Sequence, residues 1–305
     1  MSQVSIGLDN INASEIALGL MRIADKTTDE TVKLLETAVE HGVNFFDNAD
    51  IYGGGDSERR FGDALAASTI NRDDILIQTK VGIGKNEYDF SKQHILEGLN
   101  GSLERMGLDH VDFLLLHRPD ALMEPDEIAE AFFELQKSGK VREFGVSNFN
   151  PMQIELLQQA VAQPLVINQL QLGLMHTGMI DFGFHTNMTD PRSTNHDGGI
   201  YEYSRLNNMT IQAWSPYQYG FFEGVFIDNP KFPEVNAMLH KIADKYHSNV
   251  NAVAAAWILR LPTSVQVIAG TTNPERLAQI CEADQVQLTR SEWYDLYLAA
   301  GNDLP

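Results

Sequence analysis

Four polar residues that suit proton transfer come at or just after the ends of short apolar runs. Asp47, Lys80 and His117 close three successive runs, and Tyr52 stands shortly after Asp47. A tyrosine is a weak acid near neutrality because its ordinary pKa is about 10. A nearby ammonium favours the phenolate and lowers that pKa by roughly 1–3 units. Lys80 suits this role, so the set points to proton transfer through Tyr52.

The remaining side chains complement the tyrosine. A carboxylate such as Asp47 would hold Lys80 in place and keep it charged in a partly desolvated pocket. His117 would donate a hydrogen bond to a substrate oxygen and orient it. The set can thus deliver a proton to an oxygen that gains negative charge, but it holds no hydride source. A reduction at this site needs a cofactor.

Each of these residues also has a structural interpretation when it is taken singly. Asp47 is compatible with a turn or helix cap, Lys80 with a solvated strand end and His117 with a hydrogen-bonded core histidine. Tyr52 is compatible with packing beside the glycine-rich turn that follows it. The joint placement of the residues at consecutive strand ends is what favours a shared site.

The elements that would position these residues alternate regularly along the chain. Short apolar runs, often rich in β-branched or aromatic residues, are separated by longer stretches of helical periodicity. We expect strands at residues 15–20, 43–46, 74–79, 111–116, 141–146, 164–169, 209–214 and 264–269. Eight strand-and-helix repeats predict an α/β fold, a single (β/α)8 TIM barrel, with residues 1–305 forming one domain.

Further polar or aromatic groups follow the later strands of this barrel. Loops after the carboxyl ends of barrel strands converge on one mouth, where chemistry is built. The groups that would reach the mouth beside the first four are Ser147, Asn148, Gln169, Trp214, Ser215, Gly270, Thr271 and Thr272. An open doubly wound sheet is the competing fold, but its glycine fingerprint has only one candidate, residues 82–87, which lacks the last glycine.

Two segments fall outside the repeat. Residues 4–8 read as a hairpin strand that pairs with 15–20, turns at Asp9-Asn10 and caps the bottom of the barrel. Residues 172–207, after the sixth barrel strand, are long and have little periodicity, so we expect a lid or specificity loop there. Its histidines fit no short metal-ligand motif, and we expect no metal site.

Composition excludes several classes of function. Among the 305 residues, Lys and Arg number 22 against 42 for Asp and Glu, and the net charge of −20 argues against nucleic acid and anionic membrane surfaces. With 43% hydrophobic residues the chain can bury a large core. The single cysteine, Cys281, forms no internal disulfide, and the start of the chain resembles no targeting signal. We therefore expect a cytoplasmic protein.

Seven ordered motifs resemble those of the aldo/keto reductase family, and most closely a bacterial branch of general oxidoreductases. They are FDNADIYGGGDSE (46–58), ILIQTKVG (75–82), LLLHRPD (114–120), SGKVREFGVSNF (138–149), INQLQ (167–171), AWSPYQYG (213–220) and IAGTTNPERL (268–277). The shorter motifs are weakly specific by themselves. The ordered set spans nearly the whole chain and is very specific.

The resemblance implies a catalytic tetrad of Asp47, Tyr52, Lys80 and His117, in which Tyr52 is the general acid in carbonyl reduction and the general base in the reverse direction. It also implies a nicotinamide dinucleotide that lies across the mouth without a glycine fingerprint. The implied cofactor-binding residues are Ser147, Asn148 and Gln169 at the carboxamide, Trp214 against the nicotinamide ring, Ser215, Pro216, Tyr217, Gly270, Thr271 and Thr272 along the phosphates, Arg276 at the 2′-phosphate, and Gln279.

Two departures from the family pattern bear on the choice of cofactor. Many relatives have a lysine where this chain has Gly270, and leucine is common at the position of Tyr217. Arg276 still matches the arginine that grips the 2′-phosphate. We therefore expect NADP(H) to be preferred and NAD(H) to be possible.

The sequence thus predicts a reductase of aldehydes or ketones whose partner is a small-molecule carbonyl substrate. Met21 and Arg22 would line the substrate pocket, and the protein would be a monomer or a weak homo-oligomer. One alternative is a nicotinamide-nucleotide-sensing regulatory subunit on the same barrel. Another, a metal-dependent barrel hydrolase, is disfavoured because His117 is the only histidine at a strand end.

Overall fold

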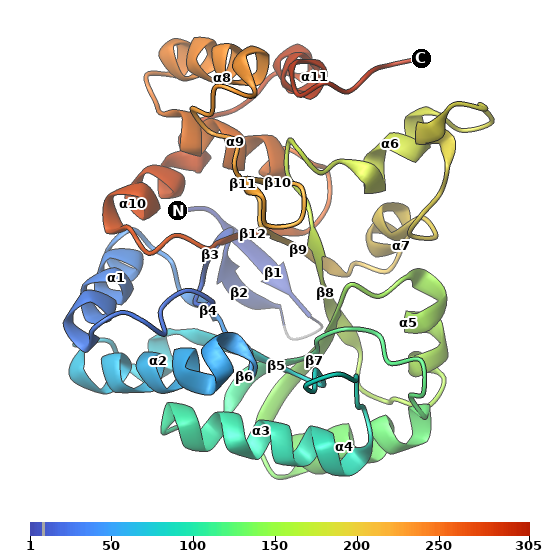
Figure 1. Ribbon diagram of the computed structural model, residues 1–305. Coiled ribbons are helices and arrows are strands. Elements are labelled where there is room, and N and C mark those ends of the chain that lie inside the picture. The colour runs from blue at the N-terminus through green and yellow to red at the C-terminus, as the bar shows by residue number, and fades with distance from the viewer. Residues whose placement is uncertain (8–9) are drawn as a thin grey trace.

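Eight parallel strands close into a barrel in the computed structural model, which describes residues 1–7 and 10–305 (Figure 1). In chain order they are β3 (Ile16–Gly19), β4 (Phe45–Asp47), β5 (Leu76–Val81), β6 (Val111–Leu116), β7 (Val141–Ser147), β8 (Leu165–Gln171), β9 (Thr210–Trp214) and β12 (Val265–Ala269). Strand β12 pairs with both β9 and β3 and so completes the ring. Each expected strand overlaps one of these, and the predicted fold is confirmed.

Helices surround the barrel in Figure 1, which looks nearly along its axis. They are α1 (Thr28–Glu40), α2 (Asp56–Ala67), α3 (Lys92–Met106), α4 (Pro125–Lys137), α5 (Pro151–Gln158), α6 (Gly178–Phe184), α7 (Ile200–Leu206), α8 (Pro233–Tyr246), α9 (Val250–Leu259), α10 (Pro274–Cys281) and α11 (Arg290–Ala299). Several begin with side-chain caps, such as the reciprocal pair of Thr27 and Glu30 before α1. In the described part of the chain, no helix is long and apolar enough to span a bilayer.

A hairpin closes the end of the barrel opposite the mouth. Strand β1 (Gln3–Ile6) pairs with β2 (Ile11–Ser14), and Ile6 and Ile11 pack on barrel residues such as Phe113. The hairpin and its capping position are as predicted, but its expected partner, residues 15–20, is wrong. Those residues include β3, which is buried on both faces and belongs to the barrel. The expected turn at Asp9-Asn10 includes residue 9, which lies outside the described residues.

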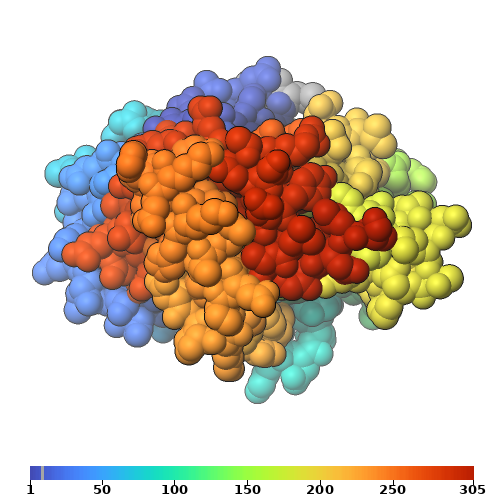
Figure 2. Space-filling view, turned by 90° about the horizontal axis from the view of Figure 1, so that it is seen from above, coloured from blue at the N-terminus to red at the C-terminus, as the bar shows by residue number. Residues whose placement is uncertain are grey.

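Residues 172–207 follow β8 and fold into α6, the short 3₁₀ turn Pro191–Ser193 and α7. Arg192 ties this segment to the end of the chain, since its guanidinium lies 3.0 Å from Asp181 Oδ2 and 2.7 Å from Asp303 Oδ1. Figure 2 shows the red C-terminal residues between α8, in orange, and the yellow segment around α6.

A second, short hairpin follows β9. Its strands are β10 (Gln218–Tyr219) and β11 (Gly224–Val225), and in Figure 1 it lies in front of the barrel. No sequence pattern predicted this hairpin. Gly220 and Phe222 both have positive φ values, of 59° and 61°, which lets the chain turn back within a few residues.

Candidate active site

The predicted catalytic residues meet at the carboxyl ends of β4, β5 and β6. The Lys80 ammonium lies 2.8 Å from Asp47 Oδ1, and it donates hydrogen bonds to the Tyr52 hydroxyl at 3.1 Å and to Asn48 O at 2.7 Å. The His117 ring stands edge-on to the Tyr52 ring, with centroids 5.9 Å apart. The structure therefore brings the four predicted side chains into one contacting group.

The turn after Tyr52 depends on glycine. Gly53, Gly54 and Gly55 all have positive φ values, a conformation that L side chains rarely adopt. A Cβ atom on Gly53 would also lie 2.6 Å from the Cβ of Ala24. The glycines thus allow the chain to bend directly after Tyr52 and into α2, which leaves the phenol beside Lys80.

A chain of buried glutamines holds Asp47 from inside the barrel. Gln78 and Gln169 both donate to Asp47 Oδ1, at 2.5 and 3.1 Å, and both donate to Gln212 Oε1. Gln212 in turn donates to Gln266 Oε1 at 2.8 Å. These amide donors hold the Asp47 carboxylate in place beside Lys80. Gln78, Gln212 and Gln266 were missed by sequence reasoning, although a glutamine within each apolar strand was a visible signal.

Burial and charge set the protonation states at this end of the barrel. Burial alone would lower the pKa of Lys80, but the Asp47 carboxylate raises it above its usual value, so the ammonium stays charged. Burial raises the pKa of Tyr52, and the Lys80 charge opposes this effect without cancelling it. Burial also holds the pKa of His117 well below its usual range. At neutral pH the site therefore holds a protonated phenol and a neutral imidazole.

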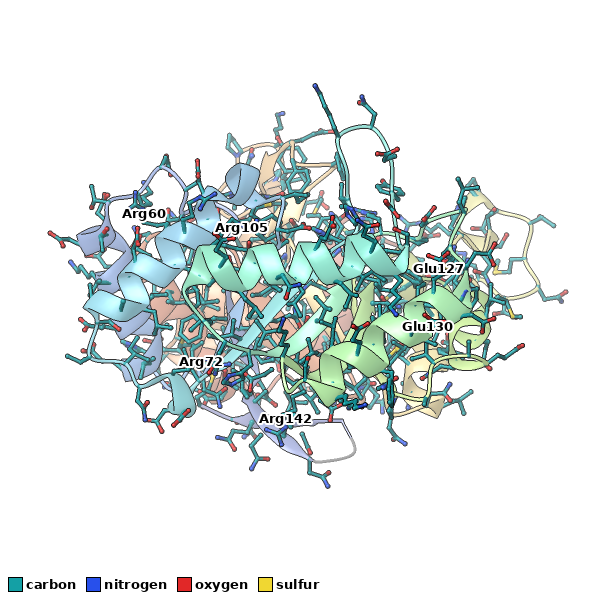
Figure 3. All side chains as sticks on the ribbon, turned by 90° about the horizontal axis from the view of Figure 1, so that it is seen from below. Arg60, Arg72, Arg105, Glu127, Glu130 and Arg142 are labelled. Carbon is teal, nitrogen blue, oxygen red and sulfur yellow. The ribbon has the colours of Figure 1, made fainter. Side chains whose placement is uncertain are left out.

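A second buried ion pair lies behind the first. Glu58 on α2 accepts hydrogen bonds from Arg105 Nε on α3, at 2.7 Å, and from the Thr79 hydroxyl, at 2.6 Å. Figure 3 shows Arg105 where α2 and α3 lie side by side. Burial and the nearby Glu58 charge raise the pKa of Asp50 to about 7. Asp50 donates its backbone N–H to Lys80 O, so this cluster supports the loop that carries Tyr52.

The contacting group opens into a cavity of about 920 Å³ at the barrel mouth. We call the part near Asp47, Tyr52, Lys80 and His117 the tyrosine end. The predicted residues that line the cavity are Met21, Arg22, Asp47, Tyr52, His117, Ser147, Asn148, Gln169, Trp214, Ser215, Pro216, Tyr217, Gly270, Thr271, Thr272, Arg276 and Gln279. Lys80 is the exception, because it is fully buried behind Asp47 and Tyr52.

Next to the tyrosine end, the cavity is lined by one indole ring and by polar side chains. Trp214 donates from Nε1 to Asn148 Oδ1 at 3.1 Å, and Asn148 donates to the Ser147 hydroxyl at 2.7 Å. Asn148 and Ser215 both have positive φ values, a strain that clusters at functional sites. An aromatic face with amide and hydroxyl groups at its edge fits a flat heteroaromatic amide such as nicotinamide.

The far part of the cavity, which we call the α10 end, comprises Gly270, Thr271, Thr272 and Arg276. Arg276 is exposed in the first turn of α10, and among the described residues its guanidinium has no ion-pair partner. Asn273 caps the helix by accepting from the backbone of Glu275 and Arg276. A helix start with an unpaired arginine suits a phosphate group, so both parts of the cavity fit an extended dinucleotide.

The expected role of residues 172–207 is wrong in one respect. None of these residues lines the cavity; the segment packs against the C-terminal residues instead. The β10–β11 hairpin lies at the mouth instead, because Phe222 and Val225 line the cavity. The Phe222 ring packs nearly parallel to the Trp214 ring, with centroids 6.0 Å apart. Sequence reasoning missed Phe222, which no motif distinguishes from a core phenylalanine.

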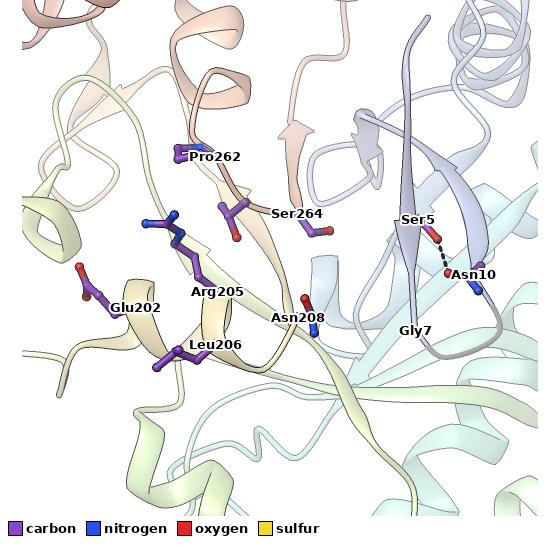
Figure 4. A pocket seen from close by; sticks show the side chains of 10 residues that line it. Ser5, Gly7, Asn10, Glu202, Arg205, Leu206, Asn208, Pro262 and Ser264 are labelled. Carbon is purple, nitrogen blue, oxygen red and sulfur yellow. Dashed lines mark hydrogen bonds between the residues drawn. The ribbon is translucent and has the colours of Figure 1, made fainter.

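A second cavity, of about 730 Å³, lies at the opposite end of the barrel, near the β1–β2 hairpin (Figure 4). Its charged lining residues are Glu202 and Arg205 of α7. It contains none of the predicted site residues, and Leu206 on its rim is largely exposed. The mouth cavity is therefore the candidate active site.

Proteins of one family resemble this chain over nearly its whole length. Residues 15–297 match the Aldo/keto reductase family. A 6-dehydroglucose reductase of Agrobacterium fabrum is 35% identical over 97% of each chain, and the oxidoreductase YdhF of Escherichia coli is 31% identical over 100% of each chain. The solved structure of the thermostable aldo-keto reductase Tm1743 has a TM-score of 0.79, with 24% identity over 98% of this chain and 100% of that one.

Proposed function

Because the chain belongs to the aldo/keto reductase family, whose members use nicotinamide cofactors, we propose that it is an NADPH-dependent reductase of aldehydes or ketones with Tyr52 as the proton donor. The observation that carries this proposal is the contact of the Lys80 ammonium with both Asp47 and the Tyr52 hydroxyl in the cavity wall. A single buried group thereby links an ionised carboxylate to the phenol that faces the cavity.

The proposed catalytic roles follow from the protonation states. Tyr52 holds its proton at neutral pH, as a proton donor to a carbonyl oxygen must. The Lys80 ammonium stabilises the phenolate that remains after the transfer, and Asp47 keeps Lys80 charged and in place. His117, a neutral imidazole beside Tyr52, donates a hydrogen bond to the same oxygen.

The cofactor site is proposed along the cavity from the tyrosine end to the α10 end. A bound reduced nicotinamide supplies the hydride. Trp214 offers its face to the ring, while Ser147, Asn148 and Gln169 offer hydrogen-bonding groups to a carboxamide. The residues proposed to hold the phosphates are Ser215, Pro216, Tyr217, Gly270, Thr271, Thr272, Arg276 and Gln279. Arg276 favours NADP(H), and the lack of a second cation at Gly270 leaves NAD(H) possible.

We assign residues 1–305 to one barrel domain that acts on a small carbonyl compound and uses Met21 and Arg22 in its substrate pocket. A cytoplasmic location and a monomeric or weakly homo-oligomeric state remain predictions. The alternative, a nucleotide-sensing regulatory subunit, would use the same cofactor residues without needing turnover.

The test is a panel of aldehydes and ketones, read by the absorbance of NADPH and then NADH. The panel includes glyceraldehyde, since a relative is named for reducing a dehydroglucose. We expect turnover of several aldehydes, faster with NADPH than with NADH. Tight NADPH binding without turnover of any carbonyl compound would overturn the proposal of a reductase and favour that of a nucleotide-sensing subunit. Failure to bind either nucleotide would overturn both.

A further inference from the structure

Arg118 lies directly after His117 and is half-buried in the wall of the cavity. Its guanidinium carbon is 5.8 Å from the centre of the Trp214 ring. Its charge opposes the rise that burial causes in the pKa of Tyr52 and adds to the lowering that burial causes in the pKa of His117, so it lies near the reacting groups. It follows β6, which lies across the barrel from β12 and the α10 end. None of the expected site residues included it.

Three other partly buried arginines in the described part of the chain have carboxylate partners, and a fourth, Arg60, donates a hydrogen bond to the Thr28 hydroxyl at 2.8 Å. Arg72 lies 2.8 Å from Asp112, Arg105 lies 2.7 Å from Glu58 and Arg192 lies 2.7 Å from Asp303. Arg118 forms no ion pair with any described residue, and its guanidinium lies over the Trp214 ring. A partly desolvated guanidinium without an anion is unfavourable, so its presence in the cavity wall of a chain of net charge −20 favours an anion supplied from outside.

The charges around the cavity leave room for such an anion. Arg22, Lys80, Arg118 and Arg276 are the cations in or behind its wall, and Asp47 and Asp228 are its lining carboxylates. Asp47 is already bonded to Lys80, and Asp228 lies 2.7 Å from His240. The α10 end suits a cofactor phosphate, whereas Arg118 lies beside Trp214 and His117, where the substrate would be.

We propose that Arg118 is a substrate-binding residue and that the preferred substrate is a carbonyl compound that carries an anionic group, in the simplest case a carboxylate. A planar guanidinium can donate two parallel hydrogen bonds to a carboxylate, which a neutral substrate cannot match. The inference rests on the proposed function, because it names the substrate class of the same site.

The test compares substrates that differ only in charge. The ortho, meta and para isomers of formylbenzoate are each compared with the corresponding methyl ester. The three acids place the anion at different positions relative to the carbonyl. The measured quantity is the ratio of kcat/KM for each acid to kcat/KM for its ester. The variants are Arg118→Gln, Arg118→Lys and, as a matched control, Arg290→Gln, which changes an exposed arginine at the start of α11 that does not line the cavity.

We expect at least one isomer to give a ratio of about ten or more in the unchanged protein, since a charge-assisted hydrogen bond commonly contributes a factor of this size. Arg118→Gln should reduce that ratio at least about tenfold, and Arg118→Lys should retain part of it because charge remains but the planar fork is lost. Arg290→Gln should leave the ratio unchanged. Ratios near one for all three isomers, or an equal loss for acid and ester in Arg118→Gln, would overturn the proposal.

A binding measurement separates this inference from the proposed function. Calorimetric titration of the reduced products meta- and para-carboxybenzyl alcohol against protein saturated with NADP⁺ requires no turnover. Tighter binding of either acid than of its methyl ester, lost in Arg118→Gln, would support the anion site even if no aldehyde were reduced. Equal binding of acid and ester for both isomers would overturn it even if the protein proves to be an active reductase.

Discussion

Lys80, at the tyrosine end of the cavity, is fully buried and bonded to Asp47, Asn48 and Tyr52, whereas Arg276, at the α10 end, is exposed and unpaired among the described residues. Both are cations of one cavity in an acidic protein. At the tyrosine end, however, the partners of the cation belong to the protein itself. At the α10 end, the cation faces solvent and is free to pair with a ligand.

Because their cations differ in pairing and burial, we expect the two ends to contribute differently to function. Groups that the fold already holds in place act on a developing charge without rearranging, which favours an effect on the chemical step. An exposed arginine must give up side-chain freedom when a ligand binds, so its net contribution is smaller and appears in affinity. Changes at the tyrosine end should therefore act on kcat and on folding, and changes at the α10 end on cofactor affinity.

The largest effect is expected from Tyr52→Phe, which removes the proposed proton donor. We expect kcat for aldehyde reduction to fall roughly 10²- to 10⁴-fold. The affinity for NADPH, followed by fluorescence titration, should stay within about twofold because the residues of the α10 end are untouched. Tyr88→Phe, at an exposed tyrosine, serves as the control. Undiminished kcat in Tyr52→Phe would show that this end does not perform the proton transfer.

Lys80→Met should lower both the free energy of unfolding and kcat. It leaves the Asp47 carboxylate buried without its ion-pair partner, and loss of one partner of a buried pair destabilises by about 3–5 kcal/mol. The free energy of unfolding, measured in urea, should fall by about this amount and should partly recover in the double variant Asp47→Asn with Lys80→Met. A double variant as unstable as Lys80→Met alone would contradict the ion-pair explanation.

Arg276→Ala addresses the α10 end by itself. Loss of a charge-assisted bond to a phosphate, worth about 1.5–3 kcal/mol, should weaken NADPH binding roughly ten- to a hundredfold. The affinity for NADH, which lacks the 2′-phosphate, should not change, and neither should the free energy of unfolding. If both nucleotides lose affinity equally, Arg276 does not read the 2′-phosphate.

Asp50→Asn tests the protonation state behind the tyrosine end. Folding raises the pKa of Asp50 from 3.8 to about 7, so the folded state keeps a proton that the unfolded state loses between these values. Wild-type stability therefore decreases as pH rises from about 4 to 7, relative to a variant that cannot ionise. We expect the Asn variant to gain about 1–2 kcal/mol over wild type between pH 4 and pH 8, a value reduced for partial solvent exposure. A gain that does not depend on pH would contradict this origin.

The smallest effect is expected from Gly270→Lys. Gly270 is exposed, its φ is not positive, and a Cβ atom there would meet nothing within 4 Å. The added cation should tighten NADPH binding roughly two- to fivefold, because an exposed ion pair contributes about 1 kcal/mol or less. Gly270→Gln provides the control for side-chain size. An equal gain in both variants would assign the effect to contact area instead of charge.

Much of the fold and of the candidate site could be predicted from local pattern. Each barrel strand was visible as an apolar run bounded by helical periodicity, and Asp47, Lys80 and His117 were visible as polar residues at the ends of such runs. The geometry of a barrel then brings strand ends together without knowledge of any individual contact. Local regularity was enough because both the strand period and the position of a strand end are local properties.

The wrong predictions concern contacts between segments that are far apart in the chain. The N-terminal strand pairs with residues 11–14 instead of 15–20, because the latter complete the barrel between β4 and β12. The 172–207 segment is long enough to cover the mouth, yet Arg192 binds it to the last residues of the chain. No local sequence pattern indicates either pairing, since each depends on competition among segments far apart in the chain.

The barrel, the order of its strands and the identity of the polar groups at its mouth follow from periodicity and from residue type, so they could be predicted from the amino-acid sequence alone. How those groups are held and charged depends on contacts that exist only in the folded protein. Gln78 and Gln212 stand 134 residues apart yet share the network around Asp47, and burial outweighs Lys80 in raising the pKa of Tyr52. No sequence pattern distinguished Arg118, which the fold places in the cavity without an ion-pair partner among the described residues, because pairing and desolvation depend on the neighbours that folding supplies.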